Sequence, residues 1–133
     1  MSVKKLNCIT ELQGNIYPIE FNDIPFDVKR VFYVTNVPQF EERGFHAHYE
    51  TEQILICIQG KINIKLYNGK KYKNYIIFPG ESIYVGKLIW DSQQYLTGND
   101  ILMSLCSTAY NINDYVIDFT QYQKIIGEIN EKN

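Results

Sequence analysis

The chain has 133 residues, with 13 lysines and arginines, 15 aspartates and glutamates, and a formal net charge of −2. This length predicts a single domain over residues 1–133, and the slightly acidic balance provides no basic field for nucleic acid or an anionic membrane. Because no apolar stretch reaches the length of a signal peptide or a membrane span, we expect a cytoplasmic protein with neither nucleic acid nor membrane as a partner.

The first predicted elements are two strands, over residues 15–21 and 29–35, joined across Asn22-Asp23-Ile24-Pro25. Both segments mix β-branched and aromatic residues with polar ones, and Asn, Asp and Pro between them are residues typical of turns. The chain therefore begins in the two-residue period of β-structure.

The residues from Arg43 to Gln53 contain both histidines of the protein, His46 and His48. Side chains two residues apart on a strand leave on the same face, so the two imidazoles are predicted to share one pocket. Glu52 keeps the same parity if the strand stays regular. Because the pKa of histidine suits proton transfer or metal binding near neutrality, a shared pocket favours chemistry over a surface strand that happens to carry two polar residues.

Further along, Lys61 to Tyr67 alternate polar and apolar residues and lead into Asn68-Gly69, the pair that favours a tight two-residue hairpin turn. The returning strand runs from Lys71 to Phe78, and shorter strands are expected at 82–86, 89–90, 93–97 and 100–107. Many short strands at this spacing predict an all-β barrel or sandwich.

The last segment changes period, because apolar residues recur on one face of a helix at Phe119, Tyr122, Ile125, Ile126 and Ile129. Asp118 is placed to cap this helix, with Gln121 three residues later at capping-box spacing. The C-terminal helix is predicted to act as a lid or a brace.

Two motifs stand out among the predicted strands: His46-Ala47-His48 with Glu52, and residues 78–81 followed by 84–86. They resemble the first and second motifs of the cupin family. The resemblance implies an all-β fold of the cupin type, a jelly-roll β-barrel with a C-terminal helix. Asp91 follows Trp90 at the place where metal-binding cupins usually carry a last histidine.

A more specific likeness lies in blocks that occur in order over nearly the whole chain: residues 24–33, 43–48 with Glu52-Gln53, 84–86, Trp90, and Asp114-Tyr115. The pairing of the first two blocks is specific. With these blocks the chain is similar, within the cupins, to the dTDP-sugar 3,4-ketoisomerases, which convert dTDP-4-keto-6-deoxyglucose into a 3-keto isomer. The resemblance implies a dTDP-linked keto-deoxysugar as substrate.

Moving a ketone from C4 to C3 needs a base that removes the C3 proton, stabilisation of the enediolate, and delivery of a proton to C4. The resemblance implies His48 as the C3 base, His46 as its partner in proton handling, and Tyr33 as an active-site hydroxyl. This chemistry needs no redox cofactor, so we expect no cofactor and no metal ligands.

The expected substrate-binding residues are Arg30, Arg43, Trp90, Tyr84, Gln13 and Asp91. Arg30 and Arg43 suit a diphosphate at the mouth of the site, although either could instead form a surface salt bridge. Trp90 and Tyr84 could stack on thymine or line the barrel. Related enzymes often carry other residues near Gln13 and at Asp91, so these two positions are candidates for biasing the product.

The product is expected to be the galacto-configured 3-keto-6-deoxy sugar, made for an amino-deoxysugar of surface glycans. The C3 hydrogen lies on the lower face of the ring, and two histidines on one strand face approach from one side, so C4 also receives its proton from below. The gluco product would need a donor above the ring, for which Asp91 is the candidate. The resemblance also implies a homodimer, in which the N-terminal strands could be exchanged.

Two other functions remain open. In a metal-dependent cupin, His46, His48 and Glu52 would be the metal ligands, and Asp91 could complete the set. A sugar-sensing or scaffold barrel without activity is the third possibility, in which the two histidines would have no chemical purpose. Metal analysis separates the first alternative from the isomerase, and turnover of a dTDP-ketosugar separates both from the third.

Overall fold

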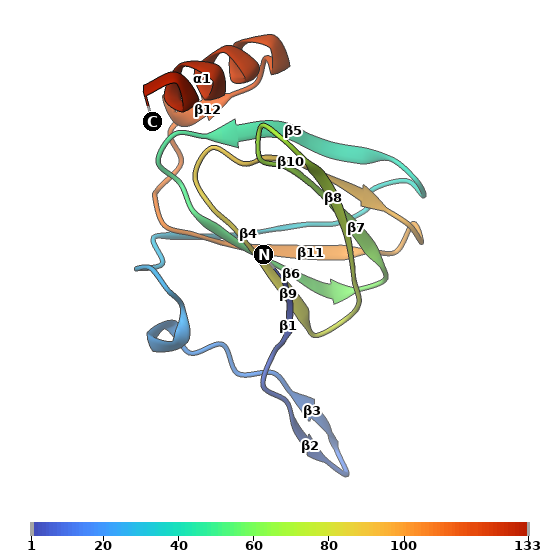
Figure 1. Ribbon diagram of the computed structural model, residues 1–133. Helices are drawn as coiled ribbons and strands as arrows, with labels where there is room; N and C mark the ends of the chain where they lie inside the picture. The colour runs from blue at the N-terminus through green and yellow to red at the C-terminus, as the bar shows by residue number, and fades with distance from the viewer. Residues whose placement is uncertain (1, 133) are drawn as a thin grey trace.

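The computed structural model describes residues 2–132, which form two facing five-stranded antiparallel sheets, a small hairpin and a C-terminal helix (Figure 1). The strands are β1 (Val3–Lys5), β2 (Ile9–Glu11), β3 (Gly14–Ile16), β4 (Arg30–Val34), β5 (Glu42–His48), β6 (Gln53–Gln59), β7 (Ile62–Tyr67), β8 (Tyr72–Ile77), β9 (Glu81–Val85), β10 (Trp90–Tyr95), β11 (Ile101–Cys106) and β12 (Tyr115–Val116). The helices are the 3-10 turns η1 (Phe21–Asp23) and η2 (Ile112–Asp114) and the α-helix α1 (Phe119–Lys132).

The first sheet has the strand order β1-β9-β6-β11-β4, and the second has the order β12-β5-β10-β7-β8. Neighbours in each sheet are mostly distant in the sequence, as in a jelly roll. The predicted all-β jelly-roll fold with a C-terminal helix is confirmed. The strand predicted over 89–97 in two pieces is the single strand β10.

The core lies between the sheets, because alternate residues of each strand point inward. On β7, Ile62, Ile64 and Leu66 are buried, while the residues between them are partly exposed. The other fully enclosed core residues include Leu55, Cys57, Ile77, Ile83, Val85, Tyr95 and Leu102. A hairpin joins β7 to β8, but the two-residue turn predicted at Asn68-Gly69 is wrong, because Tyr67 pairs with Tyr72 and the loop is residues 68–71. Gly69 lies in this loop at φ 96°.

Helix α1 lies on the outer face of the second sheet (Figure 1), against Ala47 and Trp90. Asp118 caps it as predicted, since the Asp118 Oδ1 atom accepts the backbone N–H of Gln121 at 2.8 Å. The Tyr122 hydroxyl donates to the Leu88 carbonyl at 2.7 Å. The helix is therefore a brace behind the sheet. Within the part of the chain described, no helix has the length and hydrophobicity to cross a membrane.

The hairpin of β2 and β3 projects from the opposite end of the molecule (Figure 1), and the two strands pair only with each other among the described elements. Its side chains are exposed, including Ile9, Leu12 and Ile16. The strand predicted over 15–21 is therefore wrong beyond Ile16. Pro18 lacks the N–H that would continue the ladder, and the chain turns into η1 at Phe21 instead.

Candidate active site

His46 and His48 extend from β5 into the space between the sheets, while Ala47 between them packs under α1 on the outer face. The two imidazole centroids lie 4.8 Å apart with an interplanar angle of 81°. The two-residue spacing thus brings both rings into contact on one face of β5, as the sequence predicted. His48 is 5% exposed and the His46 side chain is 20% exposed. We call the two rings and the side chains around them the histidine pocket.

A bulge in β5 adds Arg43 to the same side of the sheet. Asp91 of β10 pairs with His46 and Ser92 pairs with Gly44, so Phe45 is the extra residue. Gly44 and Phe45 both have positive φ, 98° and 60°. Because the bulge shifts the parity by one residue, Arg43 shares the inner face with His46 although they lie three apart.

Asp91 is a buried carboxyl beside His46, with 1% of its surface exposed. Its Oδ1 atom accepts a hydrogen bond from the Gln93 amide, and its Oδ2 atom lies 3.9 Å from His46 Nε2. Among the described residues Oδ2 has no hydrogen-bond partner. Burial raises the pKa of Asp91 to about 6, although His46 and the Gln93 amide oppose that shift. This carboxyl therefore titrates close to neutrality.

His48 is electrically neutral over the physiological range. Burial, the largest influence, lowers the pKa of its imidazole to about 4 together with the electrostatic effects of His46 and Arg30, and Asp114 opposes that shift. A neutral imidazole next to a second imidazole can accept a proton from a carbon acid.

Arg30 faces the histidines from β4 of the opposite sheet. Its guanidinium carbon lies 4.7 Å from the ring centroid of Phe32 and 5.1 Å from that of Tyr110. The two rings hold the cation near His48, whose pKa it lowers. Arg30 and Arg43 thus approach the pocket from different sheets.

Sequence reasoning gave no role to Tyr115, whose ring closes the histidine pocket. Its centroid lies 4.5 Å from that of His48 and 5.2 Å from that of His46. Strand β12 places it there by pairing Tyr115 with His48. Asp114-Tyr115 contributed to the family likeness, but a two-residue strand has too short a pattern to predict which way a side chain points.

Three expected site residues lie away from the two histidines. Tyr33 is on the outer face of β4 and is 68% exposed, because the alternation that turns Arg30 and Phe32 inward turns it outward. Trp90 packs on the outer face of the second sheet, with its ring centroid 5.1 Å from that of Phe119. Gln13 lies at the tip of the exposed β2–β3 hairpin.

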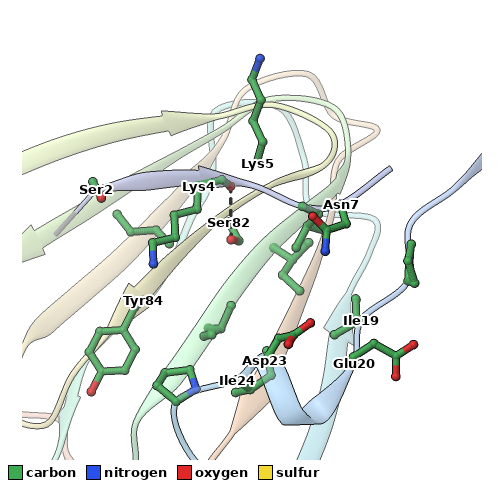
Figure 2. Close-up of a pocket in the computed structure, with 16 residues that line it drawn as sticks. Ser2, Lys4, Lys5, Asn7, Ile19, Glu20, Asp23, Ile24, Ser82 and Tyr84 are labelled. Atoms are coloured by element: carbon green, nitrogen blue, oxygen red, sulfur yellow. Dashed lines mark hydrogen bonds between the residues drawn. The ribbon is translucent and has the colours of Figure 1, made fainter. Parts of the chain in front are cut away.

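Tyr84 is also outside the histidine pocket. Its ring lines a groove of about 440 Å³ on the outer face of the first sheet. Figure 2 shows the ring beside the strand that carries Lys4. Ser82, which precedes it by two residues on β9, donates to the Lys4 carbonyl at 3.3 Å. Within one chain Tyr84 therefore does not join the histidines, and its predicted role in substrate binding stays a prediction.

The ligand set of the metal-dependent alternative is not brought together. Glu52 accepts a hydrogen bond from the Tyr84 hydroxyl on the outer side of the first sheet. Strand β5 ends at His48 and β6 begins at Gln53, so the intervening turn removes the parity that the sequence assumed. Over residues 2–132, no group of three His, Cys, Asp or Glu side chains is arranged to hold a metal ion.

The model of the FdtA family, described as WxcM-like, C-terminal, matches residues 1–127 of the chain. A TDP-4-oxo-6-deoxy-alpha-D-glucose-3,4-oxoisomerase from Aneurinibacillus thermoaerophilus is 33% identical over 124 residues, which cover 92% of this chain and 89% of that protein.

Solved structures are similar over nearly the whole length. QdtA, a sugar 3,4-ketoisomerase from Thermoanaerobacterium thermosaccharolyticum in complex with TDP, is 32% identical with a TM-score of 0.90, covering 96% of this chain and 94% of QdtA. A 3,4-ketoisomerase from Helicobacter canadensis is 28% identical with a TM-score of 0.90, covering 95% of this chain and 96% of that one.

Proposed function

The chain belongs to the FdtA, WxcM-like family of dTDP-sugar 3,4-ketoisomerases, and we propose that it converts dTDP-4-keto-6-deoxyglucose into a 3-keto isomer. The observation that carries the proposal is the neutral, buried imidazole of His48 in contact with His46 and faced by Arg30. A base that stays unprotonated near neutrality is what enolisation at C3 requires.

In the proposed reaction, His48 removes the proton from C3, and the electrons of that bond form a double bond between C3 and C4. Negative charge develops on the C4 oxygen, which a guanidinium can stabilise. A proton then returns to C4 from the imidazole pair, and the C3 hydroxyl loses its proton as the C3 ketone forms. The C3 hydroxyl proton is in effect moved to the C4 oxygen, so the two sugars are isomers.

The two arginines have different surroundings and, we infer, different tasks. Arg30 is held between Phe32 and Tyr110 beside His48, which suits stabilisation of the enediolate oxygen. Arg43 is exposed at the rim on β5, which suits bidentate binding of the diphosphate. The Asp91 carboxyl, next to His46, is proposed to pass a proton to that imidazole.

The galacto-configured product remains the proposal for the stereochemistry at C4. His46, His48 and Asp91 all belong to the second sheet, on the neighbouring strands β5 and β10, which supports proton transfer from one side of the ring. The facing strand β4 presents Arg30 and Phe32, neither of which donates a proton to carbon. A small H4–H5 coupling in the fresh product would agree, and a large diaxial coupling would contradict it.

A homodimer is proposed to complete the site. The β2–β3 hairpin projects from its own subunit and exposes apolar side chains, which supports contact with a second copy. In such a pair Gln13 at its tip would approach the partner's pocket, in keeping with its expected role in substrate binding.

The function is tested by incubating the protein with dTDP-4-keto-6-deoxyglucose in D₂O and following the sugar by proton NMR. We expect a 3-keto product and deuterium at C4, with and without prior chelation of divalent metals. A substrate that remains unchanged in both conditions would refute the proposal. Turnover that chelation abolishes and one divalent ion restores would favour the metal-dependent alternative.

A further inference from the structure

Tyr115 contacts both imidazoles of the pocket. The centroids of the three rings are 4.5, 4.8 and 5.2 Å apart, so each ring touches the other two. The Tyr115 ring is tilted by 60° to His48 and 62° to His46. A ring in this position restricts the rotation of both imidazoles and keeps water from one side of them.

Asp114, the preceding residue, fastens this segment to the turn that follows His48. Its carboxylate is buried and accepts the backbone N–H of Glu50 at 2.7 Å, the N–H of Thr51 at 3.1 Å, and the Thr51 hydroxyl. Its carbonyl oxygen accepts the N–H of Tyr49 at 3.0 Å. These four hydrogen bonds join η2 directly to residues 49–51, which are continuous with β5.

We propose that Tyr115 is a positioning residue of the isomerase: its ring orients the His48 imidazole and excludes water from it. Asp114 holds Tyr115 in place through its hydrogen bonds to residues 49–51. The expected effect on turnover rests on the proposed function, whereas the contact between Tyr115 and His48 does not depend on it. His48 depends on such a neighbour because a general base must meet the C3 proton in one orientation.

The charged and titratable groups around His48 come from four other places in the fold and from its own strand. His46 is on β5, Arg30 on β4, Asp114 on η2 and Tyr115 on β12, while Asp91 on β10 faces His46. His46 and Arg30 lower the pKa of His48, and Asp114 raises it. Burial is the largest influence and lowers it. Removing the Tyr115 ring should therefore raise the pKa of His48 toward its ordinary value of 6.5.

The test compares Tyr115→Phe, Tyr115→Leu and Tyr115→Ala with Ile117→Ala, a control at an exposed side chain in the same segment. The first variant keeps the ring, the second keeps apolar volume, and the third keeps neither. We expect Tyr115→Ala to lower kcat by roughly ten- to a hundredfold with little change in KM, since misplacement of a catalytic group has effects of this size. Tyr115→Phe and Ile117→Ala should stay within about threefold of the wild type.

Asp114→Asn removes the negative charge of the carboxylate that anchors this segment. Like Tyr115→Ala, it should lower kcat. Each variant is also titrated by ¹H–¹⁵N NMR of the imidazoles, which is simple because the chain has 2 histidines and His46→Asn assigns them. In Tyr115→Ala the His48 titration and the acid limb of kcat/KM should both move to higher pH by about one unit or more.

An unchanged kcat and an unchanged His48 titration in folded Tyr115→Ala would overturn the proposal. A large loss of kcat in Tyr115→Phe with a normal His48 titration would also overturn it, since the hydroxyl would then be catalytic. Because the NMR titration needs no turnover, an inactive wild type would count against the proposed function while still testing the role of Tyr115.

Discussion

Burial has opposite consequences for the protonation of two side chains in the pocket. It lowers the pKa of His48 to about 4 and raises that of Asp91 to about 6, because each group loses the hydration of its charged form. The result at neutral pH is an imidazole free to accept a proton, and a carboxyl beside His46 that titrates nearby. These are the properties of a site for acid–base chemistry.

Replacing His48 by Asn is expected to remove nearly all ketoisomerase activity, because the amide keeps the approximate shape but cannot act as a base. The loss should be about a hundredfold or more in kcat. TDP binding, measured by calorimetry, should remain close to that of the wild type. Near-normal turnover of the variant would mean that another group removes the C3 proton.

Replacing Asp91 by Asn is expected to stabilise the fold at pH 7.5 by on the order of 2 to 3 kcal/mol, because it removes a buried charge. The folded-state pKa of about 6 lies above the ordinary value of 3.8, so this carboxyl makes the wild type less stable as pH rises between those values. At about pH 3 the carboxyl is protonated in the folded state and largely protonated in the unfolded state, so the difference should nearly vanish.

Urea denaturation of both proteins at about pH 3 and about pH 7.5 measures this effect. His48 is present in both proteins, so its own pH dependence cancels in the comparison to first order. A stabilisation that is the same at both pH values would show that packing, and not the buried charge, is responsible.

At the scale of elements, the irregularity of β5 decides what the pocket contains. A regular strand would turn Arg43 to the opposite face from His46, but the bulge at Gly44 and Phe45 restores it to the inner side. A Cβ atom on Gly44 would lie 2.9 Å from Gln93 Nε2 and 3.1 Å from the Asp91 carbonyl oxygen. Glycine is therefore required there by both backbone conformation and space.

Gly44→Ala is expected to destabilise the protein by about 1 to 3 kcal/mol and to lower kcat/KM, because it displaces Gln93 and the Asp91 backbone. Gly127→Ala is the matched control: Gly127 lies in α1 with no atom within 4 Å of an added Cβ. That control should stabilise the helix by up to about 1 kcal/mol. Equal thermal shifts for the two variants in circular dichroism would contradict the role of the bulge.

At the scale of the whole molecule, the two sheets bring together residues that are far apart in the sequence. Arg30 arrives from the first sheet, and the histidines, Asp91 and Tyr115 from the second. The β2–β3 hairpin takes no part in this pocket within its own subunit and extends away from the sandwich (Figure 1). This arrangement is the basis for proposing that a second copy receives it.

A complementation experiment tests that proposal. Neither His48→Asn nor a protein lacking residues 9–16 should be active by itself. If the hairpin acts in the partner's site, refolding a mixture of the two should restore activity, because one site of each mixed dimer has both His48 and a hairpin. Sedimentation of each protein alone controls for dimer formation, and a mixture that stays inactive although mixed dimers form would refute the exchange.

Local sequence patterns predicted the all-β class, a hairpin between β7 and β8, the capped C-terminal helix and the contact of His46 with His48. Those features depend on neighbours along the chain, where a period of two or a turn pair directly dictates which side chains share a face. The likeness of ordered blocks also indicated the family.

The other residues that join the histidines are set by the tertiary structure. Tyr33, Tyr84 and Trp90 lie on outer faces, while Arg43 turns inward through a bulge and Tyr115 arrives on a two-residue strand. The face of the sheet to which a side chain points depends on where its strand starts, whether a bulge interrupts the strand and which sheet the strand joins. Contacts between distant segments set these features, so they cannot be predicted from residue spacing along one strand.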